Sequence, residues 1–97
     1  MAAMRVMVAS VAFLKAAGTG YAIGLNERGD RVEFIGDWRL LAELQAAIDL
    51  AGTPQSSNVE DWQVLAINGS LRLPLSKAAL AERATFVRAA TRQVRHR

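Results

Sequence analysis

The chain has 97 residues, which suits one domain and leaves no room for a second hydrophobic core. Hydrophobic residues make up 52% of it and cysteine is absent, which excludes disulfides, thiolate nucleophiles and cysteine-ligated metal sites. Its 12 basic and 9 acidic residues, with a net charge of +3, argue against a disordered chain. We therefore expect a single cytoplasmic globular domain over residues 1–97.

Residues 6–14 form an apolar run behind Arg5 that resembles the hydrophobic part of a signal peptide, so secretion is the minor alternative. The run is too short to span a bilayer, and we expect no membrane association. Whether translation starts at Met1 or Met4 stays open.

Three strands are expected first. Residues 5–14 are rich in valine and predict a buried strand, with a helix as the alternative. Residues 20–26 alternate between a large face (Tyr21, Ile23 and Leu25) and a small one (Ala22, Gly24 and Asn26), which predicts close approach of another element to the small face. Residues 27–30 predict a turn at Gly29, and residues 31–36 return as a strand.

A helix follows, with Asp37 as its N-cap and Gly52 and Pro54 at its end. At 100° per residue its apolar positions share one arc: Leu40, Leu41, Leu44, Ala47, Ile48 and Ala51. Residues 53–61 predict a polar loop whose tip, residues 56–58, is mobile.

Residues 62–75 predict a hairpin turning at Asn68-Gly69, a pair suited to a type I′ turn. The expected register pairs residues of one apolar face: Ala66 with Leu71, Val64 with Leu73 and Trp62 with Leu75. Leu65 and Ile67 then fall on the other face, beside Ser70 and Arg72.

Ser76 predicts the cap of a last helix that runs to about Val94. Its apolar side holds Leu80, Ala84, Val87 and Val94, with Phe86 and Ala90 widening the arc. Arg83 lies inside this arc and must reach solvent or find a carboxylate.

The element order β-β-β-α-β-β-α predicts an α+β fold: an antiparallel sheet of about five strands with two helices packed on it, which we expect on one face. An OB-like barrel is the alternative.

Charge divides the chain unevenly. Residues 1–76 hold six basic and eight acidic residues, a net −2, and residues 77–97 hold six basic and one acidic residue, a net +5. Lys77, Arg88, Arg92 and Arg95 fall within an arc of about 60° on the helical wheel, and Arg97 follows them. This pattern predicts contact with an anion, either nucleic-acid phosphate or an acidic protein surface. A merely solvated helix face is the alternative.

No catalytic, cofactor-binding or metal-binding residues are expected. His96 is the sole histidine and is next to last in the chain, where we expect fraying, so neither a Ser-His-Asp triad nor an imidazole metal site is expected. Asp37, Glu43, Glu60 and Asp61 are expected to cap a helix or to face solvent. We expect no enzymatic activity.

The leading hypothesis is a non-catalytic binding module whose basic C-terminal helix contacts a nucleic-acid backbone. The alternative is a protein-interaction regulator or inhibitor that binds an acidic or nucleoprotein partner, with an interface at Trp38, Arg39, Leu65 and Ile67. In size and layout alone, the chain is similar to accessory and anti-defence proteins of phages and mobile elements. A homodimer is also possible through a 4-3-4-3 stripe: Leu80, Ala84, Val87, Thr91 and Val94.

Overall fold

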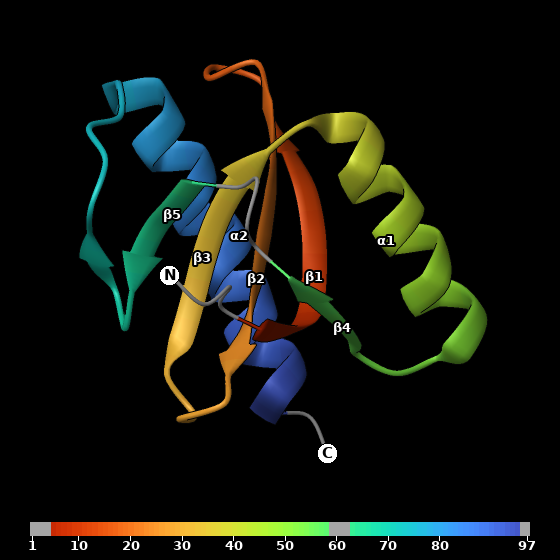
Figure 1. Ribbon diagram of the computed structural model, residues 1–97. Helices are drawn as coiled ribbons and strands as arrows, with labels where there is room; N and C mark the ends of the chain where they lie inside the picture. The colour runs from red at the N-terminus through yellow and green to blue at the C-terminus, as the bar shows by residue number, and fades with distance from the viewer. Residues whose placement is uncertain (1–4, 59–62, 96–97) are drawn as a thin grey trace.

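A computed structural model describes residues 5–58 and 63–95, except for the side chains of Asn58 and of residues 91–95. Its elements are β1 (Arg5–Leu14), β2 (Thr19–Asn26), β3 (Arg31–Gly36), α1 (Trp38–Ala51), β4 (Gln55–Asn58), β5 (Gln63–Ile67), β6 (Ser70–Leu71) and α2 (Lys77–Arg95). The strands form one antiparallel sheet in the order β4-β1-β2-β3-β5-β6, with two helices packed on it (Figure 1). The α+β prediction is confirmed, and the sheet is open rather than closed into a barrel.

The first three strands form the expected meander. Residues 5–14 are a strand, not a helix, and pair with β2, which pairs in turn with β3. The turn after β2 has Gly29 at φ 84°, the positive value that favours glycine. Inside this turn the Asn26 side chain accepts hydrogen bonds from the backbone N–H groups of Arg28 (3.0 Å) and Asp30 (2.9 Å).

The prediction of a polar loop over residues 53–61 is wrong at residues 55–58. These form β4, which pairs with β1 from Val8 opposite Gln55 to Arg5 opposite Asn58. An edge strand with one face towards solvent needs no alternation of apolar residues. The polar sequence of β4 therefore gives no sign that it forms a strand. The part of that prediction at residues 59–61 lies outside the described residues.

The second hairpin has the expected turn but a shorter ladder. Asn68 (φ 50°) and Gly69 (φ 85°) supply the two positive φ angles of a type I′ turn, and Ala66 pairs with Leu71. One further hydrogen bond runs from the Arg72 N–H to the Leu65 carbonyl (2.7 Å), but the strand pairing ends before Leu73, and the next residue, Pro74, has no N–H to donate. The predicted pairing of Val64 with Leu73 is therefore wrong, and that of Trp62 with Leu75 lies outside the described residues.

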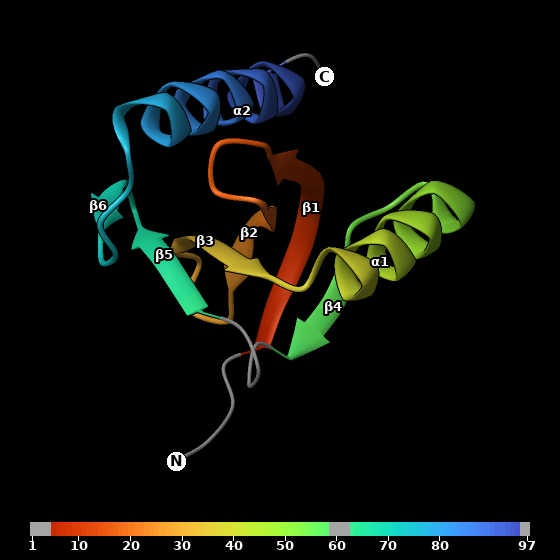
Figure 2. The ribbon, with the colours of Figure 1, turned by 90° about the horizontal axis from the view of Figure 1, so that it is seen from above.

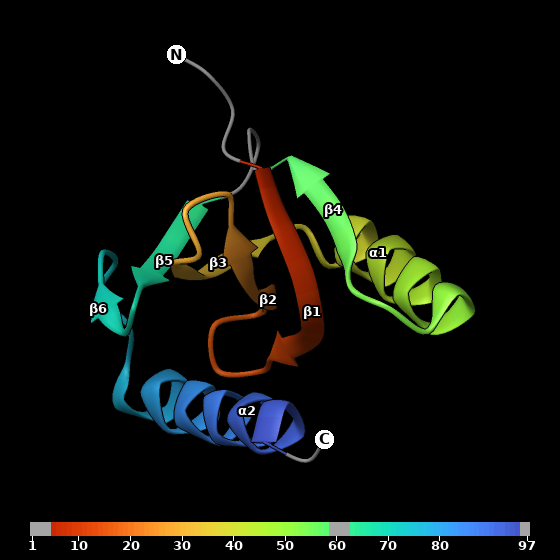
Figure 3. The ribbon, with the colours of Figure 1, turned by 90° about the horizontal axis from the view of Figure 1, so that it is seen from below.

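The expectation that both helices share one face of the sheet is also wrong. Ala22 of β2 belongs to a core cluster with Leu41, Leu44 and Ile48 of α1. Its neighbours Tyr21 and Ile23 belong to a second cluster, whose α2 members are Phe86, Val87 and Ala90. Because successive side chains of a strand point to opposite faces, α1 and α2 cover opposite faces of the sheet (Figures 2 and 3).

The small face of β2 explains where α1 lies. A Cβ atom added at Gly20 would collide with the side chain of Leu41, which is fully buried. The predicted close approach is therefore confirmed: the approaching element is α1 at Gly20, and at Gly24 it is β1, through the Met7 backbone and the Val6 side chain. The buried stripe of α1 is narrower than predicted, because Leu40 is 46% exposed and Ala47 and Ala51 face solvent.

The predicted helix caps are confirmed. The Asp37 carboxylate accepts a hydrogen bond from the backbone N–H of Arg39 (2.9 Å), and Gly52 ends α1 in the left-handed conformation. The Ser76 hydroxyl accepts one from the N–H of Ala79 (3.1 Å) at the start of α2. Neither described helix is long and apolar enough to cross a membrane.

Candidate functional site

The inner side of α2 is fixed to the sheet by an ion pair in the core. The Arg83 guanidinium donates to both carboxylate oxygens of Glu33, Nε to Oε1 at 2.5 Å and Nη2 to Oε2 at 2.9 Å. Glu33 is fully buried, and the Arg83 side chain is 14% exposed. The Tyr21 hydroxyl donates to the same carboxylate at 3.0 Å. Of the two alternatives expected from the sequence, solvent or a carboxylate, Arg83 has the carboxylate.

These contacts raise the pKa values of Tyr21 and Arg83. Burial, together with the negative charge of Glu33, raises the pKa of the Tyr21 hydroxyl far above its usual range. The hydrogen bond to Glu33 raises the pKa of Arg83, so the guanidinium stays charged. The Tyr21 ring also stacks on Phe86 of α2, with centroids 5.6 Å apart. The cluster is therefore closed and structural, and its charges are satisfied inside the fold.

The one acidic residue of α2 is also engaged. The Glu82 carboxylate accepts backbone hydrogen bonds from Lys15 (3.1 Å) and Ala16 (2.8 Å) in the turn between β1 and β2. This contact holds the turn against α2 and leaves the Lys15 side chain exposed beside the helix.

The outer side of α2 therefore carries positive charge without an acidic neighbour on the same face. Its exposed described residues are Lys77, Ala78, Ala81, Thr85, Arg88 and Ala89. Lys77 and Arg88 are three turns apart and point the same way, with only small residues between them. Figure 2 shows α2 as the outermost layer on its side of the molecule.

The structure does not describe the side chains of three of the predicted contact residues. The helix backbone continues through Arg92 to Arg95, but their side chains are not described, and Arg97 and His96 lie outside the described residues. The outer face is consequently established at Lys77 and Arg88 and follows from the helical period alone at Arg92 and Arg95.

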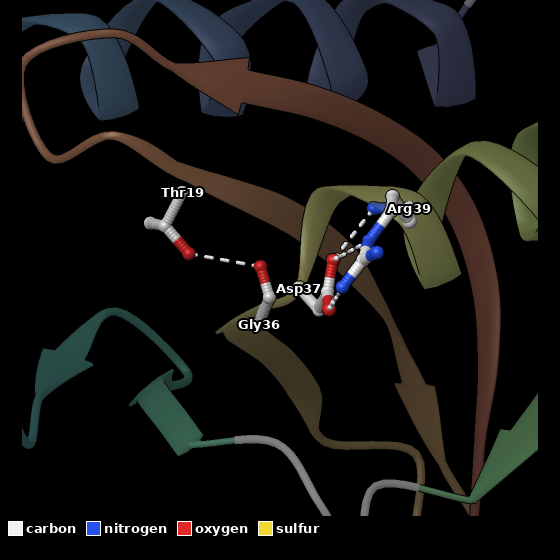
Figure 4. Close-up of polar contacts among 4 residues, drawn as sticks. All are labelled: Thr19, Gly36, Asp37 and Arg39. Carbon is white, nitrogen blue, oxygen red and sulfur yellow. Dashed lines mark hydrogen bonds and ion pairs between the residues drawn. The ribbon is translucent and has the colours of Figure 1, made fainter.

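A second surface lies where β1 ends and α1 begins. Trp38 is 41% exposed and meets the 38%-exposed Phe13 edge-on, with ring centroids 5.5 Å apart. Next to it, the Arg39 guanidinium folds over the Asp37 carboxylate (Nη2 to Oδ2, 3.2 Å), and the Thr19 hydroxyl donates to the Gly36 carbonyl (2.8 Å) (Figure 4). The hydrogen bond from Arg39 lowers the pKa of Asp37. Trp38 thus both packs on the strand end and keeps an exposed edge.

The other predicted interface residues lie differently. Leu65 is fully buried in the cluster beneath α2, because the β5 bulge turns it inward, so it offers no surface. Ile67 is half-buried at the end of β5. In the predicted dimer stripe, Leu80, Ala84 and Val87 are half-buried, and Val87 packs on the same core cluster.

Within residues 5–58 and 63–95, no group of three or more His, Asp or Glu side chains is arranged to hold a metal ion. A shallow depression of about 190 Å³ lies at the start of β1, lined by Arg5, Met7, Leu25, Asn26, Glu27 and Ser56. Its Met7 and Leu25 are half-exposed. It brings together no set of groups suited to acid–base chemistry.

The sequence interpretation missed Glu33. The signal was present, because Glu33 lies between Val32 and Phe34 on the opposite face of β3 from both. A carboxylate on one face of a strand and an arginine within an apolar helical arc are the two halves of a buried pair.

Comparison with known proteins adds no relative: no protein-family model, curated protein or solved structure matches the chain.

Proposed function

We propose that the protein is a non-catalytic binding module that contacts the phosphate backbone of nucleic acid through the outer face of α2. The observation that carries the proposal is the separation of charge on this helix. Arg83 is paired with Glu33 in the core and Glu82 is bonded to the turn between β1 and β2, whereas Lys77 and Arg88 face solvent.

Phosphate suits this face for two reasons. Cations that have no neighbouring carboxylate gain the most binding free energy from a polyanion, because their binding releases the counterions condensed on that polyanion. Ala81 and Thr85 between the two cations are small enough to let a backbone come close. Arg92, Arg95 and Arg97 would extend the same contact towards the C-terminus.

The test is the salt dependence of binding to a labelled nucleic acid, measured by fluorescence anisotropy. The doubly reversed variant Lys77→Glu/Arg88→Glu is expected to weaken binding and to flatten the slope of log K against log salt by about two units, since each lost phosphate contact contributes about 0.9.

The matched control is Arg5→Glu/Arg28→Glu, which changes the net charge equally. Both residues are exposed, at the start of β1 and in the turn between β2 and β3, at the end of the sheet away from α2 (Figure 3). This control is expected to keep most of the wild-type slope. A wild-type slope near zero, or equal losses in both variants, would contradict the proposal.

A second candidate function is a protein interaction at Phe13, Trp38 and Arg39. The observation favouring it is the exposed aromatic pair beside a largely exposed arginine, a composition typical of interface hot spots. Trp38→Ala is then expected to abolish retention of a partner from nuclease-treated lysate, while Lys77→Glu/Arg88→Glu retains it. Retention unaffected by Trp38→Ala would rule this surface out.

A further inference from the structure

The shape of the outer face of α2 indicates which kind of nucleic acid it fits. Lys77 and Arg88 are eleven residues apart, about 16 Å along the helix axis at 1.5 Å per residue. The major groove of B-form DNA is about 12 Å wide and admits an α-helix. A helix that crosses this groove obliquely therefore reaches the phosphates on both rims with side chains at these two positions.

The residues between the two cations fit the inside of a groove. This side of the helix is narrow because its exposed residues are small: Ala78, Ala81, Thr85 and Ala89. The Thr85 hydroxyl is already engaged, since it donates to the Ala81 carbonyl at 3.2 Å. None of these side chains offers a free charged or amide group to a base edge. The described part of this face therefore suits phosphate contacts and close approach rather than reading of sequence.

The same face is poorly suited to single strands. Single-stranded binding depends on aromatic side chains that stack on bases. The aromatic residue of α2, Phe86, is turned inward onto Tyr21. The exposed Phe13 and Trp38 belong to the side of the sheet that α1 covers, opposite α2.

Duplex RNA is excluded by groove shape, because the major groove of its A-form helix is deep and narrow. We propose, on the basis of the function above, that the outer face of α2 enters the major groove of double-stranded DNA, with Lys77 and Arg88 on phosphates at opposite rims. Ala81 and Thr85 then lie within the groove.

The experiment compares three probes by fluorescence anisotropy: a short DNA duplex, one of its strands alone, and an RNA duplex of the same sequence and length. The DNA duplex is expected to bind about tenfold tighter than either other probe at the same salt concentration.

A size substitution tests groove entry separately from charge. Ala81→Tyr adds bulk to the centre of the outer face and is expected to weaken binding of the DNA duplex about fivefold or more. The matched control is Ala46→Tyr at an exposed position of α1, which carries the same change in helix propensity and is expected to bind as wild type.

The outcomes separate the two proposals. Equal or tighter binding of the single strand or the RNA duplex, still lost in Lys77→Glu/Arg88→Glu, overturns the DNA-groove inference and keeps the backbone-binding function. Loss of binding in Trp38→Ala but not in Ala81→Tyr also overturns the inference, in favour of base stacking. Absence of binding to all three probes overturns both.

Discussion

At the scale of single residues, the pair of Glu33 and Arg83 carries the largest energetic consequence. The Glu33 side chain is removed from water and that of Arg83 nearly so, and a buried charge is costly unless an opposite charge and hydrogen bonds compensate it. Here the Glu33 carboxylate receives two bonds from Arg83 and one from Tyr21. The pair therefore fixes the position of α2 on the sheet more than it adds net stability.

Removing one partner should therefore cost more than removing both. Arg83→Met is expected to lower the free energy of unfolding by about 3–5 kcal/mol, because Glu33 keeps a buried charge without its partner. The double variant Glu33→Gln/Arg83→Met should recover part of this loss. Urea unfolding of the two single variants and the double variant measures the coupling. Additive losses would show that the pair is not coupled.

At the scale of elements, the two hairpins are joined through their turns. The Asn68 side chain accepts a hydrogen bond from the Arg31 backbone N–H (2.9 Å) and donates one to the Asp30 carboxylate (3.0 Å). A residue chosen for its turn conformation thus also links the β5–β6 turn to the start of β3. This link lowers the pKa of Asp30, since the amides of Asn68 and Asn26 both donate to its charged form.

The lowered pKa of Asp30 determines how the stability of the fold changes with pH. A carboxyl whose pKa is lower in the folded state adds stability above its unfolded pKa of about 4, and that stability is lost as the pH falls through the folded-state pKa. Asp30→Asn lacks this contribution, so the difference in urea midpoint between wild type and variant should shrink as the pH falls from about 5 to about 2. A difference that is constant with pH would contradict the role of Asp30.

Elements with strong local chemistry could be predicted from the sequence. The Asn68-Gly69 and Gly29 turns, the Asp37 and Ser76 caps and the alternation of β2 each have a local physical cause, and each is confirmed. Elements that depend on tertiary partners could not. β4 has only polar residues and is held by its pairing with the edge of β1, and the bulge of β5 opposite Glu33 and Phe34 has no local signal.

The candidate site likewise combines features that the sequence could predict with features that it could not. The helical period placed Lys77 and Arg88 on the outer face and Arg83 on the inner one. It could not show that the β5 bulge turns Leu65 inward or that Glu82 caps a turn 66 residues earlier in the chain, because both depend on contacts between distant segments. A local sequence pattern does not indicate contacts of this kind.

At the scale of the whole molecule, the opposite placement of the helices separates charge across the sheet. Among the described residues, α1 and its N-cap carry the acidic Asp37, Glu43 and Asp49 with Arg39 as their one basic residue, all exposed. The other side carries the outer face of α2. The sequence interpretation found this imbalance along the chain, and the fold turns it into a difference between the two sides of the sheet that α1 and α2 cover (Figures 2 and 3).

A molecule laid with α2 against a polyanion consequently turns its carboxylates and the edge of Trp38 away from it. Neighbouring copies bound in this way along the same polymer would then present an outer surface that is acidic and carries exposed aromatic rings. The exposed part of Trp38 then stays accessible to a different binding partner.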